Sequence, residues 1–133
     1  NGVYKAGFAT SPEAYEEAFK ALFKTLDMLE KHLGSNKYLV GERPTEADWR
    51  LFTTLVRFDA VYYNHFKCNR NRLIDFDNLW AYTRQLYQYP GVAETINLKH
   101  IKKHYFASHQ TINPSGIVPL GPKIDFWQAH NRC

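Results

Sequence analysis

Two histidines, His100 and His104, stand four residues apart in a segment with helical spacing, which would bring both imidazole rings to one face. Helices that bind zinc use this spacing. In the metalloprotease pattern a glutamate follows the first histidine, but here Ile101 holds that position, and three lysines within residues 99–103 would repel a cation. We interpret the pair as part of an exposed basic helix end and predict no metal site.

Thiol chemistry is the second possibility. Cys68 lies in HFKCNRNR, where neighbouring lysine and arginine residues would lower the pKa of its thiol and favour a reactive thiolate. However, no second cysteine is close enough in sequence to form a redox pair, and no acid–base partner can be identified. A packed or loop cysteine is the favoured interpretation, and reactivity stays open. Cys133 is the last residue, and we expect it to be mobile.

Phenolic hydroxyls are the third possibility, because the chain has nine tyrosines. Most of them, including Tyr15, Tyr82 and Tyr87, occupy helical positions that favour the core. Tyr4 lies in a segment of small residues, and Tyr105 closes a predicted helix just before a proline-rich segment. Both are therefore candidates to present a hydroxyl at the rim of a pocket, although spacing alone does not decide it. The chain offers no glycine-rich phosphate loop and no serine nucleophile motif.

The elements that would position these groups are helices. The segment 11–34 begins with Ser11 as an N-cap and Pro12 at the first helical position, and Gly34 is predicted to stop it. Its apolar residues recur at steps of three and four, which indicates an amphipathic helix. They are Tyr15, Phe19, Leu22, Leu26, Leu29 and Leu33.

A second helix is predicted from Thr45, because Thr45 and Asp48 have the spacing of a reciprocal N-terminal cap. The residues that follow are apolar on more than one face, which is typical of a helix in the middle of a bundle. Helical spacing returns in DNLWAYTRQLYQY, around VAETI and in LKHIKKHYF, whereas INPSGIVPLGPK predicts an extended segment. The sequence thus predicts an all-α bundle of about five helices, residues 1–107, with an extended tail, residues 108–133, packed on it.

Composition sets further bounds. Aromatic residues make up 16% of the 133 residues, which argues against disorder, and no apolar run is long enough to span a membrane. Two cysteines are too few for a disulfide framework, which favours a reducing compartment. Residues 1–49 carry six Lys and Arg against eight Asp and Glu, and residues 50–133 carry eleven against five. The basic charges are dispersed among aromatic positions, so nucleic-acid binding is the least favoured interpretation.

Specific strings add a family resemblance. YLVGERPTEADWRLF, with its Thr-x-x-Asp cap at Thr45 and Asp48, resembles the C-terminal helical domain of glutathione transferases. NGVYKAGFA, TLVRFDAVYYNHFKCN and HIKKHYFASHQTINPSGIVPLGP together resemble the glutathionyl-hydroquinone reductases, the Xi class of that superfamily. The resemblance runs from Asn1 to Pro122. It implies a cytoplasmic, homodimeric enzyme that removes glutathione, its co-substrate, from glutathionyl-hydroquinones, without a metal, nucleic acid or membrane.

The same resemblance implies roles for two residues and the absence of others. Tyr4 of NGVY and Tyr105 of KKHYF match family tyrosines that line the hydroquinone site. The catalytic cysteine and most of the glutathione site belong to an N-terminal thioredoxin-fold domain, and neither Cys68 nor Cys133 matches that cysteine. The chain also lacks an initiator methionine. We therefore expect a C-terminal half that is inactive by itself; the alternative is a non-catalytic helical module that serves protein association.

Overall fold

The computed structural model describes residues 1–132; Cys133, for which we predict mobility, lies outside the described residues. The described part is helical and contains no strand, which confirms the predicted all-α class. The α-helices are α1 (Gly2–Gly7), α2 (Pro12–Ser35), α3 (Glu46–Arg57), α4 (Asp77–Tyr87) and α5 (Leu98–Ser108). A π-helix, η1 (Phe58–Tyr62), and two 3₁₀ turns, η2 (Leu73–Asp75) and η3 (Ala93–Thr95), complete them.

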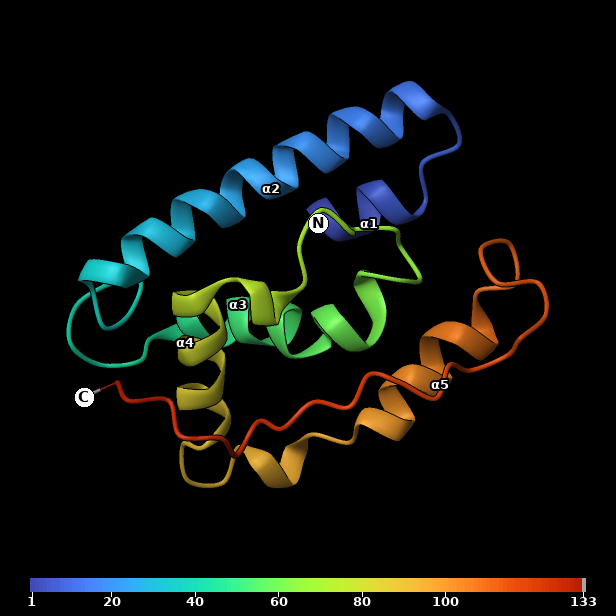
Figure 1. The fold of residues 1–133 in the computed structure, drawn as a ribbon. Helices are drawn as coiled ribbons and strands as arrows, with labels where there is room; N and C mark the ends of the chain where they lie inside the picture. The colour runs from blue at the N-terminus through green and yellow to red at the C-terminus, as the bar shows by residue number, and fades with distance from the viewer. Residues whose placement is uncertain (133) are drawn as a thin grey trace.

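The long helix α2 forms one side of the molecule, and α5 lies on the opposite side with α3 and η1 between them (Figure 1). Ser11 caps α2 as predicted, since its Oγ accepts a hydrogen bond of 3.1 Å from the N–H of Ala14. The predicted stop at Gly34 is wrong, because α2 continues to Ser35. Gly34 has another use: a Cβ there would lie 2.9 Å from the amide nitrogen of Asn78, so α2 and α4 approach closely at this point.

The segment NGVYKAGFA, for which no helix was predicted, forms α1. Val3 and Ala6 are buried one turn apart and face the bundle, and α1 lies beside the first part of α2 (Figure 1). Gly7 closes the helix against Phe66, where a Cβ would come within 2.2 Å of the phenyl ring. The small residues therefore permit a close approach of α1 to the segment that follows η1.

The Asp48 carboxylate organises the start of α3. It is fully buried and accepts hydrogen bonds from the N–H of Thr45 (2.8 Å), the N–H of Leu39 (3.0 Å) and the hydroxyl of Tyr82 (2.6 Å). A buried carboxylate needs such partners, because water does not reach it. Asp48 thus links the loop before α3, the helix itself and α4.

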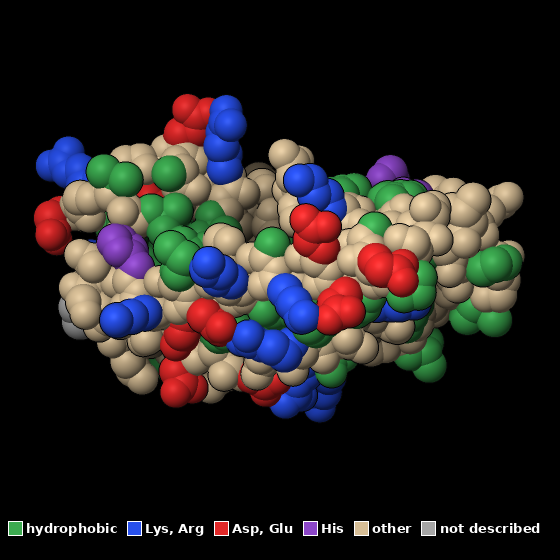
Figure 2. Space-filling view, turned by 90° about the horizontal axis from the view of Figure 1, so that it is seen from above, with side chains coloured by type: hydrophobic (Ala, Val, Ile, Leu, Met, Phe, Trp, Pro, Cys, Tyr) green, Lys and Arg blue, Asp and Glu red, His purple; other side chains and the backbone are tan. Residues whose placement is uncertain are grey.

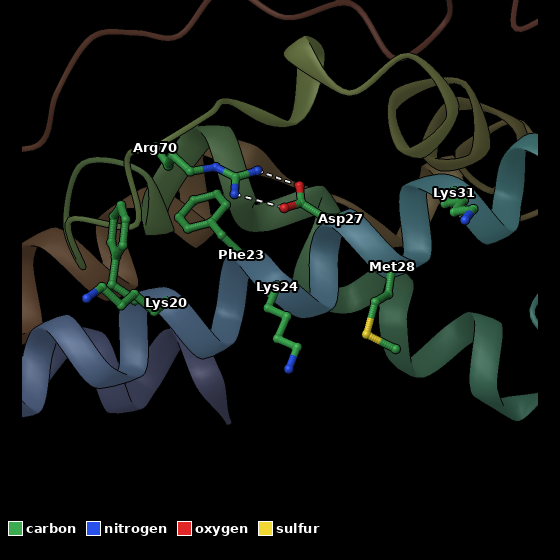
Figure 3. Close-up of a pocket in the computed structure, with 8 residues that line it drawn as sticks. Lys20, Phe23, Lys24, Asp27, Met28, Lys31 and Arg70 are labelled. Carbon is green, nitrogen blue, oxygen red and sulfur yellow. Dashed lines mark hydrogen bonds and ion pairs between the residues drawn. The ribbon is translucent and has the colours of Figure 1, made fainter.

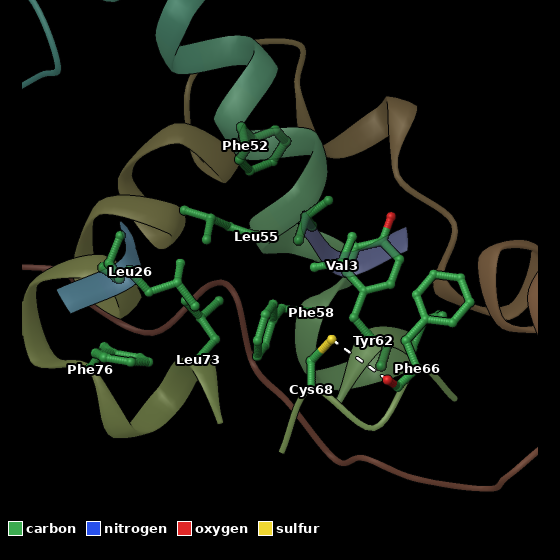
Figure 4. Packing of buried hydrophobic residues seen from close by; sticks show 14 of the residues in the cluster. Val3, Leu26, Phe52, Leu55, Phe58, Tyr62, Phe66, Cys68, Leu73 and Phe76 are labelled. Carbon is green, nitrogen blue, oxygen red and sulfur yellow. Dashed lines mark hydrogen bonds between the residues drawn. The ribbon is translucent and has the colours of Figure 1, made fainter. Parts of the chain in front are cut away.

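The core lies where α3 passes into η1. Phe52, Leu55, Phe58, Tyr62 and Phe66 follow one another along this part of the chain, and each is at most 4% exposed (Figure 4). In the π-helix the backbone hydrogen bonds span five residues instead of four, so this turn holds one residue more than a turn of α3. The central helix predicted from the sequence is therefore present, but its last turn is widened.

Residues 109–132 contain no helix and run back along α5 and α4 towards the end of α2 (Figure 1). Lys102 of α5 holds this tail, since its Nζ donates hydrogen bonds to the carbonyl oxygens of Pro119, Leu120 and Gly121 at 2.8–3.1 Å. Phe126 is buried and stacks on Tyr87 with ring centroids 4.9 Å apart. No helix in the described residues is long and apolar enough to cross a membrane.

Candidate functional site

Three tyrosine hydroxyls from distant parts of the chain meet at one point. The hydroxyl oxygens of Tyr4 in α1 and Tyr105 in α5 lie 2.5 Å apart, although the two residues are 101 positions apart in sequence. The hydroxyl of Tyr62, the last residue of η1, lies 3.1 Å from that of Tyr105. Two helices and the π-helix thus bring the three phenols together, with Tyr105 in the centre.

Burial differs across this tyrosine cluster, which we define as Tyr4, Tyr62 and Tyr105. Tyr62 is 3% exposed and Tyr105 is 7% exposed, whereas Tyr4 is 42% exposed. Burial, followed by the hydrogen bond to Tyr105, raises the pKa of Tyr4 and also that of Tyr62. Both flanking phenols therefore keep their protons at neutral pH and are able to donate to the oxygen of Tyr105.

This arrangement has a chemical consequence for Tyr105. A phenol that gives up its proton leaves a negative oxygen, and hydrogen bonds from neighbouring donors stabilise that charge. Tyr105 has such a neighbour on each side, at 2.5 Å and 3.1 Å. The cluster is therefore suited to deliver a proton from its centre, or to bind an oxygen of an aromatic ligand.

Aromatic rings surround the three hydroxyls. Phe66 stacks on Tyr62 with a centroid distance of 5.4 Å and an interplanar angle of 7°, and Figure 4 shows the two rings side by side. Phe8 and Phe66 lie 5.4 Å apart, and the imidazole of His109 lies 5.2 Å from Phe8 and 5.5 Å from Tyr105. With Phe8 46% exposed, the cluster borders an open aromatic face suited to a planar ring.

The remaining candidates from the sequence lie elsewhere or are buried. His100 and His104 are exposed, and the described residues contain no group of three or more metal-ligating side chains. Cys68 is fully buried, its Sγ contacts the carbonyl oxygen of Phe66, and burial raises the pKa of its thiol to about 12 (Figure 4). Its complete burial makes Cys68 a core residue, and a thiol with so high a pKa carries almost no thiolate at neutral pH.

A family model for the glutathione S-transferase C-terminal domain matches residues 12–85. The chain belongs to this family. The matched region contains the Thr45–Asp48 cap and Tyr62, while Tyr4 and Tyr105 lie on either side of it.

Two curated relatives carry the name glutathionyl-hydroquinone reductase. The chain is 57% identical to YqjG of Escherichia coli over 132 residues, which are 99% of this chain and 40% of YqjG. It is 60% identical to PcpF of Sphingobium chlorophenolicum over 122 residues, 92% of this chain and 39% of PcpF. The chain thus spans about two fifths of the length of these relatives.

Solved structures of glutathione transferases have the same fold. The glutathione-bound structure of E. coli YqjG matches with a TM-score of 0.97 at 57% identity, over 99% of this chain and 43% of that one. A Xi-class glutathione transferase from Natrialba magadii matches with a TM-score of 0.97 at 52% identity, over 99% of this chain and 41% of that one. The described helices therefore form the C-terminal helical domain of a Xi-class-like transferase.

Sequence reasoning missed Tyr62 and His109 as members of the aromatic face. Tyr62 lies in an apolar helix where the core explains a tyrosine, and only the fold brings its hydroxyl to Tyr105. His109 directly follows α5, in the segment assigned to the tail. The one local signal for His109 is its position four residues after Tyr105, because side chains with this spacing lie on the same side of a helix.

A second surface feature lies on α2. A groove of about 460 Å³ has Phe19, Phe23 and Met28 as its apolar part, and Asp27 pairs with Arg70 at its edge (Figure 3). The outer face around it carries cationic and anionic side chains in alternation (Figure 2). None of the three clustered tyrosines lines this groove, and its one carboxylate is engaged by the guanidinium.

Proposed function

We propose that this chain is the hydroquinone-binding domain of a glutathionyl-hydroquinone reductase. The observation that carries the proposal is the meeting of the Tyr4 and Tyr105 hydroxyls, 2.5 Å apart at an aromatic face. The names of YqjG and PcpF, 57% and 60% identical to this chain, support the same reaction. Because the chain spans only about two fifths of those relatives, the activity belongs to a longer protein.

The reaction requires a thiolate, which we assign to an N-terminal thioredoxin-fold domain. In it the carbon–sulfur bond of the glutathionyl-hydroquinone breaks, the glutathione sulfur passes to the cysteine as a mixed disulfide, and the ring carbon takes a proton. Glutathione then reduces the mixed disulfide and leaves as glutathione disulfide. A homodimer and a location in the reducing cytoplasm, where glutathione is kept reduced, are parts of this proposal.

The residues of this chain would bind the ring and handle the proton. The open aromatic face, bordered by Phe8 and Tyr105, supports stacking of a hydroquinone ring. Tyr105 would donate the proton, because Tyr4 and Tyr62 stay protonated and stabilise the oxygen left behind. The residues fit a planar ring that carries oxygen substituents.

The test uses the full-length protein with a glutathionyl-hydroquinone and glutathione, and measures free hydroquinone and glutathione disulfide. We expect one of each per turnover, and a loss of about a hundredfold or more in kcat for Tyr105→Phe. Tyr15→Phe is the matched control, because its hydroxyl donates to the carbonyl oxygen of Lys67, away from the cluster. Unchanged turnover in Tyr105→Phe, or turnover by this chain alone, would overturn the proposal.

A further inference from the structure

A pair of histidines lies directly behind the tyrosine cluster. Nε2 of His65 is 3.0 Å from Nδ1 of His109, and the two rings stack with centroids 5.1 Å apart. His65 is 3% exposed and packs edge-on against Phe106 at 4.6 Å. His109 is half-buried, and its ring lies 5.5 Å from that of Tyr105. The pair thus connects the core to the open aromatic face.

Both histidines are neutral at physiological pH. Burial, with lesser contributions from His109 and Lys67, lowers the pKa of His65 to about 4, and burial also lowers the pKa of His109, next to His104. Each ring therefore carries one proton, and a single hydrogen lies between Nε2 of one and Nδ1 of the other.

The unpartnered ring nitrogen of the pair determines which histidine donates the hydrogen bond between them. Nδ1 of His65 is buried and has no hydrogen-bond partner. If His109 donated, Nδ1 of His65 would have to carry a buried hydrogen with no acceptor, and such orphaned donors are rarer and costlier than unfilled lone pairs. If His65 donates, Nδ1 keeps only a lone pair. We infer that His65 donates from Nε2, which fixes the proton of His109 on its own Nε2.

The Nε2–H group of His109 is available to donate a hydrogen bond to a ligand. No hydrogen bond joins it to another described residue, and it is not among the buried unpartnered atoms. The ring carrying it lies edge-on to Phe8 and Tyr105, at 5.2 Å and 5.5 Å. A neutral imidazole with a fixed tautomer thus offers one N–H donor beside the aromatic face.

We propose that His109 is a specificity-determining residue whose Nε2–H binds an oxygen of the aromatic substrate, with His65 as the residue that positions it. This inference rests on the proposed function. A hydroquinone has two ring oxygens, and the tyrosine cluster engages one of them. His109 engages the other and thereby selects dioxygenated rings over monophenols.

The binding test compares variants of the full-length protein. His109→Phe keeps an aromatic ring and removes the donor, and His109→Gln keeps an N–H at similar reach. We expect about a tenfold rise in KM for the glutathionyl-hydroquinone in the Phe variant, a smaller change in kcat, and recovery in the Gln variant. His100→Phe, at an exposed position of α5 away from the tyrosine cluster, is the matched control and should leave KM unchanged.

Product inhibition tests the proposed hydrogen bond from His109 to the ring oxygen separately from the other contacts of the substrate. In the unmodified enzyme hydroquinone should inhibit about tenfold more strongly than phenol, and in His109→Phe the two inhibition constants should become equal. If His109→Phe is active and is still inhibited more strongly by hydroquinone than by phenol, the role of His109 is overturned. Lack of turnover by the unmodified enzyme would instead overturn the proposed function.

The tautomer test uses ¹H–¹⁵N correlation spectra of the imidazole nitrogens. We expect a protonated Nε2 and a bare Nδ1 in His109, and a mixture of tautomers in His65→Phe, with a raised KM. His65→Gln, which keeps a donor at the position of Nε2, guards against a folding defect and should restore the tautomer. A hydrogen on Nδ1 of His109 in the unmodified protein would overturn the proposal.

Discussion

The hydroxyl of Tyr82 donates a hydrogen bond of 2.6 Å to Oδ1 of Asp48, joining two fully buried side chains 34 positions apart. The same carboxylate also receives the N–H groups of Leu39 and Thr45. It therefore holds the loop before α3, α3 itself and α4 together, and it is a structural group rather than a catalytic one.

Replacing Asp48 by alanine should destabilise the protein severely. Four donors would lose their acceptor: the N–H groups of Leu39 and Thr45, the Thr45 hydroxyl and the fully buried Tyr82 hydroxyl. A buried donor without an acceptor costs about 1–3 kcal/mol, so with the loss of the cap we expect a loss of about 3 kcal/mol or more. Urea unfolding measures this loss. Glu46→Gln, at an exposed ion pair with Arg50 in the same helix, should leave the midpoint almost unchanged. Equal midpoints for the two variants would contradict the assigned role.

Tyr62→Phe should slow turnover without unfolding the protein. The change removes one of the two donors beside the oxygen of Tyr105 and keeps the ring that stacks on Phe66. We expect kcat of the full-length protein to fall about tenfold, less than in Tyr105→Phe, since one donor remains. Steady-state kinetics measure the fall, and an unchanged kcat would show that the third hydroxyl has no part in the reaction.

The Cys68 thiol should be inert in the folded protein. With a pKa of about 12, on the order of one thiol in ten thousand is ionised at pH 8, and the sulfur is fully buried. In a Cys133→Ser form, Ellman's reagent should react with Cys68 only after unfolding in urea. Since the pKa is raised on folding, the thiol should also lower stability as pH rises above about 9. Rapid labelling under native conditions would contradict the buried placement.

Protonation of His65 should destabilise the fold at acid pH. Its pKa is about 4 in the folded state against an ordinary value of 6.5, so the unfolded chain binds the proton more readily between these values. Stability is therefore expected to fall as pH drops from about 6.5 to about 4. Thermal unfolding across this range should show a shallower dependence in His65→Phe than in the unmodified protein. Parallel curves would mean that another group is responsible.

Arg132→Lys should release the end of the tail. The guanidinium donates to the side-chain oxygen of Gln85 and to the carbonyl oxygens of Leu33, Asn36 and Lys37 at 2.8–3.1 Å. A lysine cannot reproduce this planar fork, so we expect a loss of about 1–3 kcal/mol and faster amide exchange in residues 126–132. Arg50→Lys, an exposed exchange, should change neither quantity.

The sequence predicts the long helix, the Thr45–Asp48 cap and the helical class, because caps and apolar spacing are local signals. It does not predict α1, whose six residues are too few to show a period and which is stabilised by packing against α2 and Phe66. Gly34 misleads for the same reason, since its role lies in its approach to Asn78 rather than in a turn.

The candidate site also contains residues that the sequence indicates and residues that only the structure reveals. Tyr4 and Tyr105 are identified through a family resemblance, since neither residue carries a local signal of its partner 101 positions away. Tyr62 and the His65–His109 pair depend on how α5 packs against η1, which is a property of the assembled bundle. Their hydrogen bonds span 43 and 44 positions and leave no periodic trace in the sequence.

The π-helix η1 sets the rotational phase of everything that follows it. Each residue of a π-helix turns about 80° around the axis, against about 100° in an α-helix, so five residues in the wide turn cover about the rotation of four residues in an ordinary turn. If Phe58–Tyr62 became α-helical without losing a residue, the side chains after it would turn by about 90° around the axis, and the hydroxyl of Tyr62 would leave that of Tyr105. The wide turn thus accommodates one more residue here while the buried side chains before it and after it stay aligned on one face.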